Sequence, residues 1–144
     1  MINLGTREEY HKKLNGKERY GLEDCPFCTN IKEQEGHIIW KGKCWYIMHN
    51  MYPYSGNEKH LMAIPYTHKK CYLDLSDEEI LDFKNVNIFL KEFFGEDNYF
   101  SCLRETIANR SVEHLHYHYI PGKLKGKYLR KMLMDQGFPI KEEL

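Results

Sequence analysis

Near the C-terminal end of the chain, the segment His114 to Pro121 reads His-Leu-His-Tyr-His-Tyr-Ile-Pro, with a histidine at every second position. Side chains of a β-strand alternate between its two faces, so a strand here places three imidazoles on one face and Leu115, Tyr117 and Tyr119 on the other. Three groups that titrate near neutral pH are thereby held in register. This alternation, ended by Pro121-Gly122, predicts a reactive face and a core face. A half-exposed strand that is merely rich in histidine is the alternative.

The motif Cys25-Pro26-Phe27-Cys28 is a second group of residues that can do chemistry. Two cysteines at this spacing, followed by two distant histidines, are one standard way to hold a zinc ion tetrahedrally. A redox pair and a plain pair of reduced thiols are the other interpretations. The redox interpretation is weakened because a thioredoxin-like motif lies in a βαβ pattern, which this sequence lacks.

The composition indicates one globular domain over residues 1–144, because 42% of the residues are hydrophobic and 14% are aromatic. The formal net charge is zero, so the chain as a whole has no electrostatic preference for nucleic acid or an anionic membrane. No apolar run approaches the roughly 20 residues of a membrane span, and the polar start lacks a signal-peptide stretch. Five cysteines, an odd number, favour a reducing compartment. We expect a cytoplasmic protein without a membrane partner.

The elements that must position these residues follow from local patterns. Thr6 to Asn15-Gly16 reads as a short polar helix within an N-terminal segment of residues 1–20, which we expect to be loosely packed or mobile and which indicates no function. Apolar runs between turn residues predict strands at Ile38–Trp40, Lys43–Met48, Leu61–Pro65, Asn98–Arg104 and Glu113–Ile120. Residues 123–144 form a basic tail that includes Lys123, Lys125, Lys127, Arg130 and Lys131.

The clearest helix begins at Ser76, where Ser76 and Glu79 form a capping box, and ends at Gly95. Its expected core face, at helical spacing, consists of Ile80, Phe83, Asn87, Leu90 and Phe94. The order of the elements predicts an α+β domain, with an antiparallel β-sheet of about five strands and helices packed on one face.

The triad segment, together with the upstream stretch His60-Leu61-Met62-Ala63-Ile64-Pro65-Tyr66-Thr67-His68, resembles the histidine triad (HIT) superfamily. The family pattern is His-x-His-x-His, with an earlier apolar strand opened by His and closed by Pro-x-x-His. Cys25 to Cys28, Tyr52-Pro53-Tyr54 and Glu113 to His116 look most like the zinc-containing bacterial members, including those that act on diadenosine tetraphosphate. The resemblance covers roughly residues 22–122 and implies a HIT-like fold.

The resemblance implies a structural zinc ion, with Cys25, Cys28, His68 and His114 as its ligands. A closed site with four protein ligands has no open position for water, so the metal would fasten the N-terminal segment to the sheet and take no part in chemistry.

The resemblance also implies the catalytic residues. The neutral imidazole of His116 is the expected nucleophile, which attacks the α-phosphorus of a nucleotide and forms a nucleotidyl-histidine that water cleaves. His118 is expected to hydrogen-bond the same phosphate, or to have a supporting role only. Ser111 matches a family Ser or Thr on the leaving-group side, although a simple turn serine is nearly as good an interpretation. His60 is expected to support the site through a hydrogen bond.

The nucleoside end is less clearly marked. Asn50 matches the position where many relatives carry an Asp that binds the ribose hydroxyls. Trp45, Ile47 and Ile31 are candidate walls for a purine, and core packing explains each of them equally well.

The segment Arg104 to Ser111 departs from the family pattern, because it lacks the glycine-rich turn that lets backbone amides approach the phosphates. Arg110 stands where relatives have a small or amide residue, and Arg104 lies nearby. Either arginine can offer a charged fork to a phosphate, or block the pocket. We assign Arg110 to phosphate binding.

Two functions are compatible with these residues. The first is a HIT-type nucleotidyl hydrolase or transferase that acts on a nucleoside polyphosphate or phosphoramidate, with an adenosine dinucleotide polyphosphate as the expected substrate. The second is a catalytically weak nucleotide-binding or regulatory module. A small nucleotide is the expected partner and nucleic acid is disfavoured, since a solvated helix face explains the basic tail. The resemblance implies a homodimer.

Overall fold

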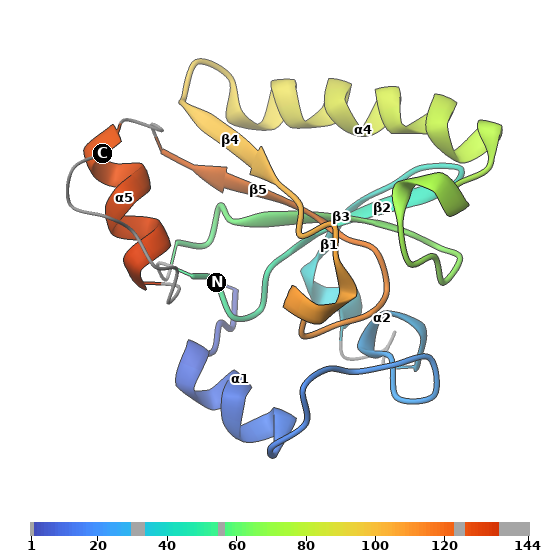
Figure 1. Ribbon diagram of the computed structural model, residues 1–144. Helices are drawn as coiled ribbons and strands as arrows, with labels where there is room; N and C mark the ends of the chain where they lie inside the picture. The colour runs from blue at the N-terminus through green and yellow to red at the C-terminus, as the bar shows by residue number, and fades with distance from the viewer. Residues whose placement is uncertain (1, 30–33, 55–56, 123–125, 136–144) are drawn as a thin grey trace.

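A computed structural model describes residues 2–29, 34–54, 57–122 and 126–135, and in these ranges the chain forms one antiparallel sheet of five strands. The strands lie in the order β1-β2-β3-β5-β4 (Figure 1). They are β1 Ile38–Lys41, β2 Trp45–His49, β3 Leu61–Pro65, β4 Tyr99–Cys102 and β5 Tyr117–Pro121. The predicted α+β class and the antiparallel sheet are therefore confirmed.

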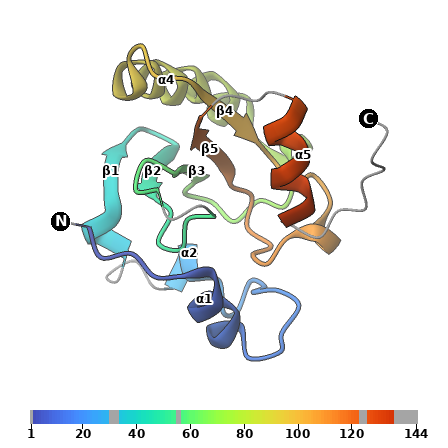
Figure 2. The ribbon, with the colours of Figure 1, turned by 90° about the vertical axis from the view of Figure 1, so that its left-hand side faces the viewer.

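Both faces of the central strands β2 and β3 are buried. Trp45, Ile47, Leu61 and Ala63 face one core, and the alternate residues Tyr46, Met48, Met62 and Ile64 face a second core. The long helix α4, Asp77–Phe94, covers the first face, while α1, Arg7–Leu14, and the short α2, Pro26–Thr29, lie on the opposite side (Figures 1 and 2). The helices are thus divided between the two faces instead of packing on one, because two apolar faces each need cover.

Helix α4 begins and ends as its sequence predicts. Ser76 and Glu79 form the capping box, and Gly95 ends the helix with φ of 60°. The core face is rotated from the predicted one, since Glu79, Asp82, Val86, Leu90 and Phe94 are buried while Ile80 is 36% exposed.

Polar contacts to the first residue of β2 and to the residue before it explain this rotation. The Asp82 carboxylate accepts a hydrogen bond from the Cys44 N–H at 2.8 Å, and the Glu79 carbonyl accepts one from the Trp45 indole at 2.7 Å. Hydrophobic spacing alone could not reveal that two acidic residues face the sheet.

The triad strand is shorter than predicted, because β5 begins only at Tyr117. Before it, the Leu115 N–H donates to the Lys69 carbonyl at 2.7 Å and the Glu113 N–H donates to the Tyr20 carbonyl at 2.8 Å, so this stretch bonds to loops instead of β3. The predicted alternation holds nevertheless. Leu115, Tyr117 and Tyr119 pack in the core under α4.

The N-terminal helix forms as predicted, with Thr6 as its N-cap and Asn15 in the left-handed conformation after it. The prediction that it packs loosely is wrong, because Tyr10 and Leu14 are buried. The Tyr10 hydroxyl donates to the Ser111 Oγ at 2.7 Å, and the Gly5 N–H donates to the Met51 carbonyl at 2.8 Å. This helix is therefore bound to the loops around the triad.

The basic tail contributes the helix α5, Gly126–Asp135, in which no residue is buried. Lys123 and Lys125 lie outside the described residues. Within the described ranges, no helix has the combination of length and apolar character that crossing a bilayer demands.

The fully buried Leu90 on α4 gives a test of the rotated core face. We expect Leu90→Ala to lower the free energy of unfolding by about 2–5 kcal/mol, since it leaves a cavity between helix and sheet. The comparison variant Ile80→Ala changes a residue that the sequence predicted for the core face and that is 36% exposed in the structure, so it should cost less than about 1 kcal/mol. Urea unfolding of both variants measures the difference, and equal losses would contradict the observed rotation.

Candidate active site and metal-binding group

A cavity of about 420 Å³ lies on the side of the sheet that carries α1 and α2, since residues of both helices line it. Its walls come from α1, the segment after β2, the loop before the triad and the triad itself. Of the residues that the sequence predicted for catalysis and substrate binding, the cavity is lined by Asn50, Arg110, Ser111, His116 and His118.

His116 lines this cavity, and one of its two ring nitrogens is hydrogen-bonded to the backbone. Its Nδ1–H donates to the His114 carbonyl at 2.8 Å, which leaves the lone pair on Nε2. Burial lowers the pKa of His116 to about 4, so the ring is neutral at neutral pH. A neutral imidazole with a fixed tautomer on a cavity wall can act as a nucleophile.

His118 has partners at both ring nitrogens. Its Nδ1 lies 2.9 Å from the Nε2 of His60, and its Nε2 lies 3.3 Å from the Tyr54 hydroxyl. Arg104 donates to the same hydroxyl at 2.6 Å. Burial, reinforced by the neighbouring His116, lowers the pKa of His118 well below its ordinary value. His118 is thus a neutral group held at the cavity by a hydrogen-bonded chain.

His60 and Asn50 extend this series of hydrogen-bonded side chains away from His118. His60 is buried, and desolvation lowers its pKa to about 3. The Asn50 side chain lies 3.3 Å from the His60 Nε2, and its Oδ1 accepts from the Tyr52 N–H at 2.8 Å. Asn50 therefore lines the cavity while it holds the loop that follows β2.

Ser111 is fixed at the cavity by the N-terminal segment. Tyr10 donates to its Oγ, and the Tyr20 N–H donates to its carbonyl at 2.7 Å. Its hydroxyl is thereby placed near the triad by residues some hundred positions away in the sequence.

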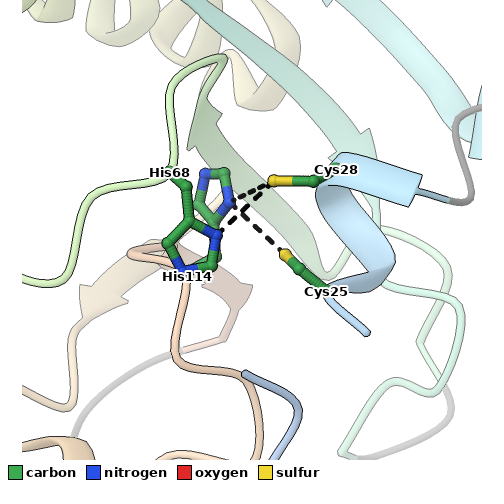
Figure 3. Close-up of side chains that lie close together, drawn as sticks. All are labelled: Cys25, Cys28, His68 and His114. Carbon is green, nitrogen blue, oxygen red and sulfur yellow. Dashed lines mark hydrogen bonds between the residues drawn. The ribbon is translucent and has the colours of Figure 1, made fainter. Parts of the chain in front are cut away.

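Four potential metal ligands converge beside this cavity: Cys25, Cys28, His68 and His114 (Figure 3). Their ligand atoms all lie within 4.8 Å of one another. The His114 Nδ1 is 3.5 Å from the Cys25 Sγ and 3.4 Å from the Cys28 Sγ, and the His68 Nδ1 is 3.5 Å from the Cys28 Sγ. With Zn–S of about 2.3 Å and Zn–N of about 2.0–2.1 Å, a tetrahedral zinc site separates sulfur and nitrogen by roughly 3.5 Å. The group has the dimensions to bind a metal.

The outer contacts of the two histidines also suit a metal site. The His114 Nε2–H donates to the Pro65 carbonyl at 2.8 Å, and the His68 Nε2–H donates to the Glu113 carboxylate at 3.1 Å. Both rings therefore direct the Nδ1 lone pair at the thiols. Burial raises the pKa of the Cys25 thiol to about 12, so a thiolate there needs a cation beside it.

Trp45 does not belong to the site, and its prediction as a purine wall is wrong. It is fully buried in the core under α4 with Ile47, on the face of the sheet opposite the cavity. Its indole N–H is used by the Glu79 carbonyl. Ile31, the third predicted wall, lies outside the described residues.

Arg110 lines the cavity, but the predicted phosphate contact is contradicted by its hydrogen bonds. Four of its N–H groups donate to backbone carbonyls, those of Arg104, Glu105, Lys70 and Glu113. A guanidinium group has five N–H donors, so little of this one remains for a ligand. Arg110 shapes the loop before the triad.

Arg7, Tyr10 and Tyr54 are among the residues of the cavity wall that sequence reasoning missed. Tyr54 lay within a recognised motif, Tyr52-Pro53-Tyr54, but no role was assigned to it. Arg7 and Tyr10 gave no signal, because nothing local shows that the N-terminal helix docks beside the triad.

Comparison with solved structures defines the class of fold. A HIT family hydrolase from Clostridium thermocellum matches with a TM-score of 0.58 and 23% identity, over 73% of this chain and 96% of that chain. A diadenosine triphosphate hydrolase from Plasmodium falciparum matches with a TM-score of 0.52 and 22% identity, over 70% of this chain and 74% of that chain. The molecule therefore has the histidine triad fold, which confirms the resemblance seen in the sequence.

Comparison of sequences identifies the family to which the chain belongs. The family described as "Protein similar to CwfJ C-terminal" matches residues 12–132, and the chain belongs to this family. An AP-4-A phosphorylase from Mycobacterium tuberculosis is 30% identical over 97 residues, which are 63% of this chain and 49% of that protein. The chain thus spans about half the length of the curated relatives it matches.

The carbonyl contacts of Arg110 predict a structural role. We expect Arg110→Met to lower the free energy of unfolding by about 2–4 kcal/mol, because it leaves several partly buried carbonyls unsatisfied. The control Lys84→Met, which removes the same charge from the exposed face of α4, should cost less than about 0.5 kcal/mol. Chemical denaturation measures both values, and wild-type stability in Arg110→Met would contradict this role.

Proposed function

We propose that the protein is a nucleotidyl hydrolase or transferase of the HIT type, which cleaves the α-phosphate linkage of a nucleoside polyphosphate or phosphoramidate. The observation that carries the proposal is the state of His116. It is a neutral imidazole on the cavity wall, with Nδ1–H on the His114 carbonyl and the lone pair on Nε2. The cavity volume of about 420 Å³ suits a small-molecule ligand.

The proposed reaction has two steps. The Nε2 of His116 attacks the α-phosphorus, and the bond from phosphorus to the leaving group breaks with its electron pair going to the leaving group. The ring gains a positive charge, which its Nδ1–H shares with the His114 carbonyl. A water molecule then attacks the phosphorus and the P–N bond breaks, so that the nucleoside monophosphate leaves, a proton is released and His116 is restored.

His118 and Ser111 are proposed to contact the same phosphate from the cavity wall. His118 is held in place by the 2.9 Å contact of its Nδ1 with His60, and its Nε2, which lies 3.3 Å from the Tyr54 hydroxyl, would exchange that longer contact for a phosphate oxygen; Ser111 is held by Tyr10. Fixed donors cost little reorganisation when charge develops on the phosphate oxygens. Asn50 is proposed to bind the ribose hydroxyls, since it lines the cavity directly after the end of β2.

The names of the similar proteins support dinucleotide polyphosphates as the substrate class. One is called an AP-4-A phosphorylase and another a diadenosine triphosphate hydrolase. We propose an adenosine dinucleotide polyphosphate as the substrate of this chain.

Cys25, Cys28, His68 and His114 are proposed to hold a structural zinc ion. The sulfur–nitrogen separations and the outer contacts of both histidines support this proposal over a redox pair, since each thiol faces an imidazole nitrogen. Zinc would supply folding free energy there, because four protein ligands close its coordination. The homodimer, the single domain and the cytoplasmic location stay predictions from the sequence.

Replacement of the nucleophile tests the proposed reaction. We expect His116→Asn to lower AMP release from diadenosine tetraphosphate by at least about 10³-fold, because the covalent route is lost. Nucleotide affinity, measured by calorimetry, should change by less than about threefold, since the substitution keeps a polar group of similar size. His37→Asn, outside the cavity, is the matched control.

Mass spectrometry of rapidly quenched wild-type reactions should detect a nucleotidyl adduct that His116→Asn lacks. Turnover by His116→Asn close to that of the wild type would refute the mechanism. Tight nucleotide binding without turnover of any substrate by the wild type would favour the binding-module function instead.

Metal analysis tests the zinc proposal. We expect about one zinc ion per chain in freshly purified protein, and Cys25→Ser should lower both the zinc content and Tm, the latter by at least about 5 °C. The control Cys102→Ser changes a cysteine outside the group and should keep the zinc. Wild-type protein prepared without chelator and found free of zinc would sink the proposal.

A further inference from the structure

Two guanidinium groups gather over one aromatic ring at the edge of the triad. The Arg7 Cζ lies 4.9 Å from the centroid of the Tyr54 ring, and the Arg104 Cζ lies 5.4 Å from it. The same tyrosine contacts His118 through its hydroxyl. Positive charge is therefore concentrated one side chain away from a triad histidine, on the wall of the cavity.

The position of Arg7 is not explained by helix stability. It is the first residue of α1, where the helix dipole already places partial positive charge, so a cation there is unfavourable for the helix. Its hydrogen bond goes to a neutral acceptor, the Tyr52 carbonyl, at 3.1 Å. Within the described part of the chain, no ion pair joins Arg7 to an acidic residue.

The cavity as a whole has an excess of cationic side chains. Arg7, Lys17, Arg104 and Arg110 line it, whereas Glu18 is the single acidic residue among the lining residues that the structure describes. The Glu18 carboxylate is paired with Arg19 at 3.1 Å. Lys17 is paired with Asp24 and Arg110 with carbonyls, whereas Arg7 and Arg104 both lie beside Tyr54, the residue that contacts His118.

We propose that Arg7 and Arg104 form a subsite for the phosphate groups that lie beyond the scissile bond, so that the N-terminal helix contributes to substrate choice. This inference rests on the proposed function, in which His116 and His118 hold the α-phosphate. Tyr54 links His118 to Arg104 by hydrogen bonds, so the next phosphate along the chain falls beside the two guanidinium groups. A planar guanidinium fork matches phosphate oxygens in shape and charge.

The subsite distinguishes substrate classes. A dinucleotide polyphosphate places further phosphates against Arg7 and Arg104, and a phosphoramidate such as AMP-lysine has none to place there. The alternative role for Arg7 is structural, because its guanidinium also lies 4.8 Å from the Tyr10 ring and helps to dock α1. The experiment must separate these two roles.

The test compares two substrates and four proteins as full chains: wild type, Arg7→Met, Arg7→Lys and Lys12→Met. Methionine keeps most of the length and stacking of the arginine side chain and removes its charge. Lys12→Met makes the same charge change on the exposed face of α1, away from the cavity lining. We expect Arg7→Met to lower kcat/KM for diadenosine tetraphosphate roughly 10- to 100-fold, mainly through KM, with less than about a threefold loss for AMP-lysine. Arg7→Lys should recover part of the loss.

Equal losses for both substrates, accompanied by a lower Tm, would show that Arg7 only docks the helix and would overturn the subsite. If the wild type cleaves neither substrate, the proposed function fails, and calorimetry with inorganic tripolyphosphate still tests the subsite. Weaker tripolyphosphate binding in Arg7→Met than in Lys12→Met would uphold it. Equal binding in the two variants would overturn it.

Discussion

The need to keep several buried imidazoles neutral is the constraint on which the site depends. The ring centroids of His116 and His118 lie 4.9 Å apart, and those of His60 and His118 lie 5.1 Å apart. Protonation of any one of them would place a cation beside its neighbours in a desolvated region, so their pKa values fall below the ordinary value. Neutral rings must still satisfy their N–H groups. The hydrogen bonds that meet this need also fix the orientation of each ring.

This constraint joins the candidate metal ligands Cys25, Cys28, His68 and His114 to the proposed nucleophile. The side chain of His114 belongs to the Cys/His group, and its Nε2–H is held by the Pro65 carbonyl. The backbone carbonyl of the same residue accepts the Nδ1–H of His116. Whatever fixes the His114 side chain therefore also fixes the peptide that selects the tautomer of His116. A structural metal at this position can matter for catalysis although it never touches the substrate.

Much of this arrangement could be read from the sequence because it depends on local spacing. The alternation in the triad segment correctly predicted that Leu115 and Tyr119 face away from the histidines. The capping box at Ser76 correctly predicted where α4 begins. The same alternation could have prevented the error at Trp45. That residue stands an odd number of positions before Asn50, so a strand between them turns the two side chains to opposite faces.

Other features depend on contacts between distant segments, which no local pattern carries. Arg110 donates to the carbonyl of Lys70, and Tyr10 donates to Ser111 across 101 positions. The polar contacts that rotate α4 likewise join Asp82 to Cys44. The residue type alone does not show whether an arginine stabilises a loop or binds a phosphate. Only the acceptors around the guanidinium group distinguish them.

The loss of the glycine-rich turn explains why positive charge is needed elsewhere in this cavity. The loop before the triad directs the carbonyls of Arg104, Glu105 and Glu113 at the guanidinium group of Arg110. A carbonyl oxygen only accepts hydrogen bonds, so the carbonyls that this loop directs at Arg110 offer no donor to a phosphate. A substrate with several phosphates still requires compensation of its charge. In the proposed subsite, the guanidinium groups of Arg7 and Arg104 beside Tyr54 would supply it, and Arg7 comes from a helix that no local sequence pattern places near the triad.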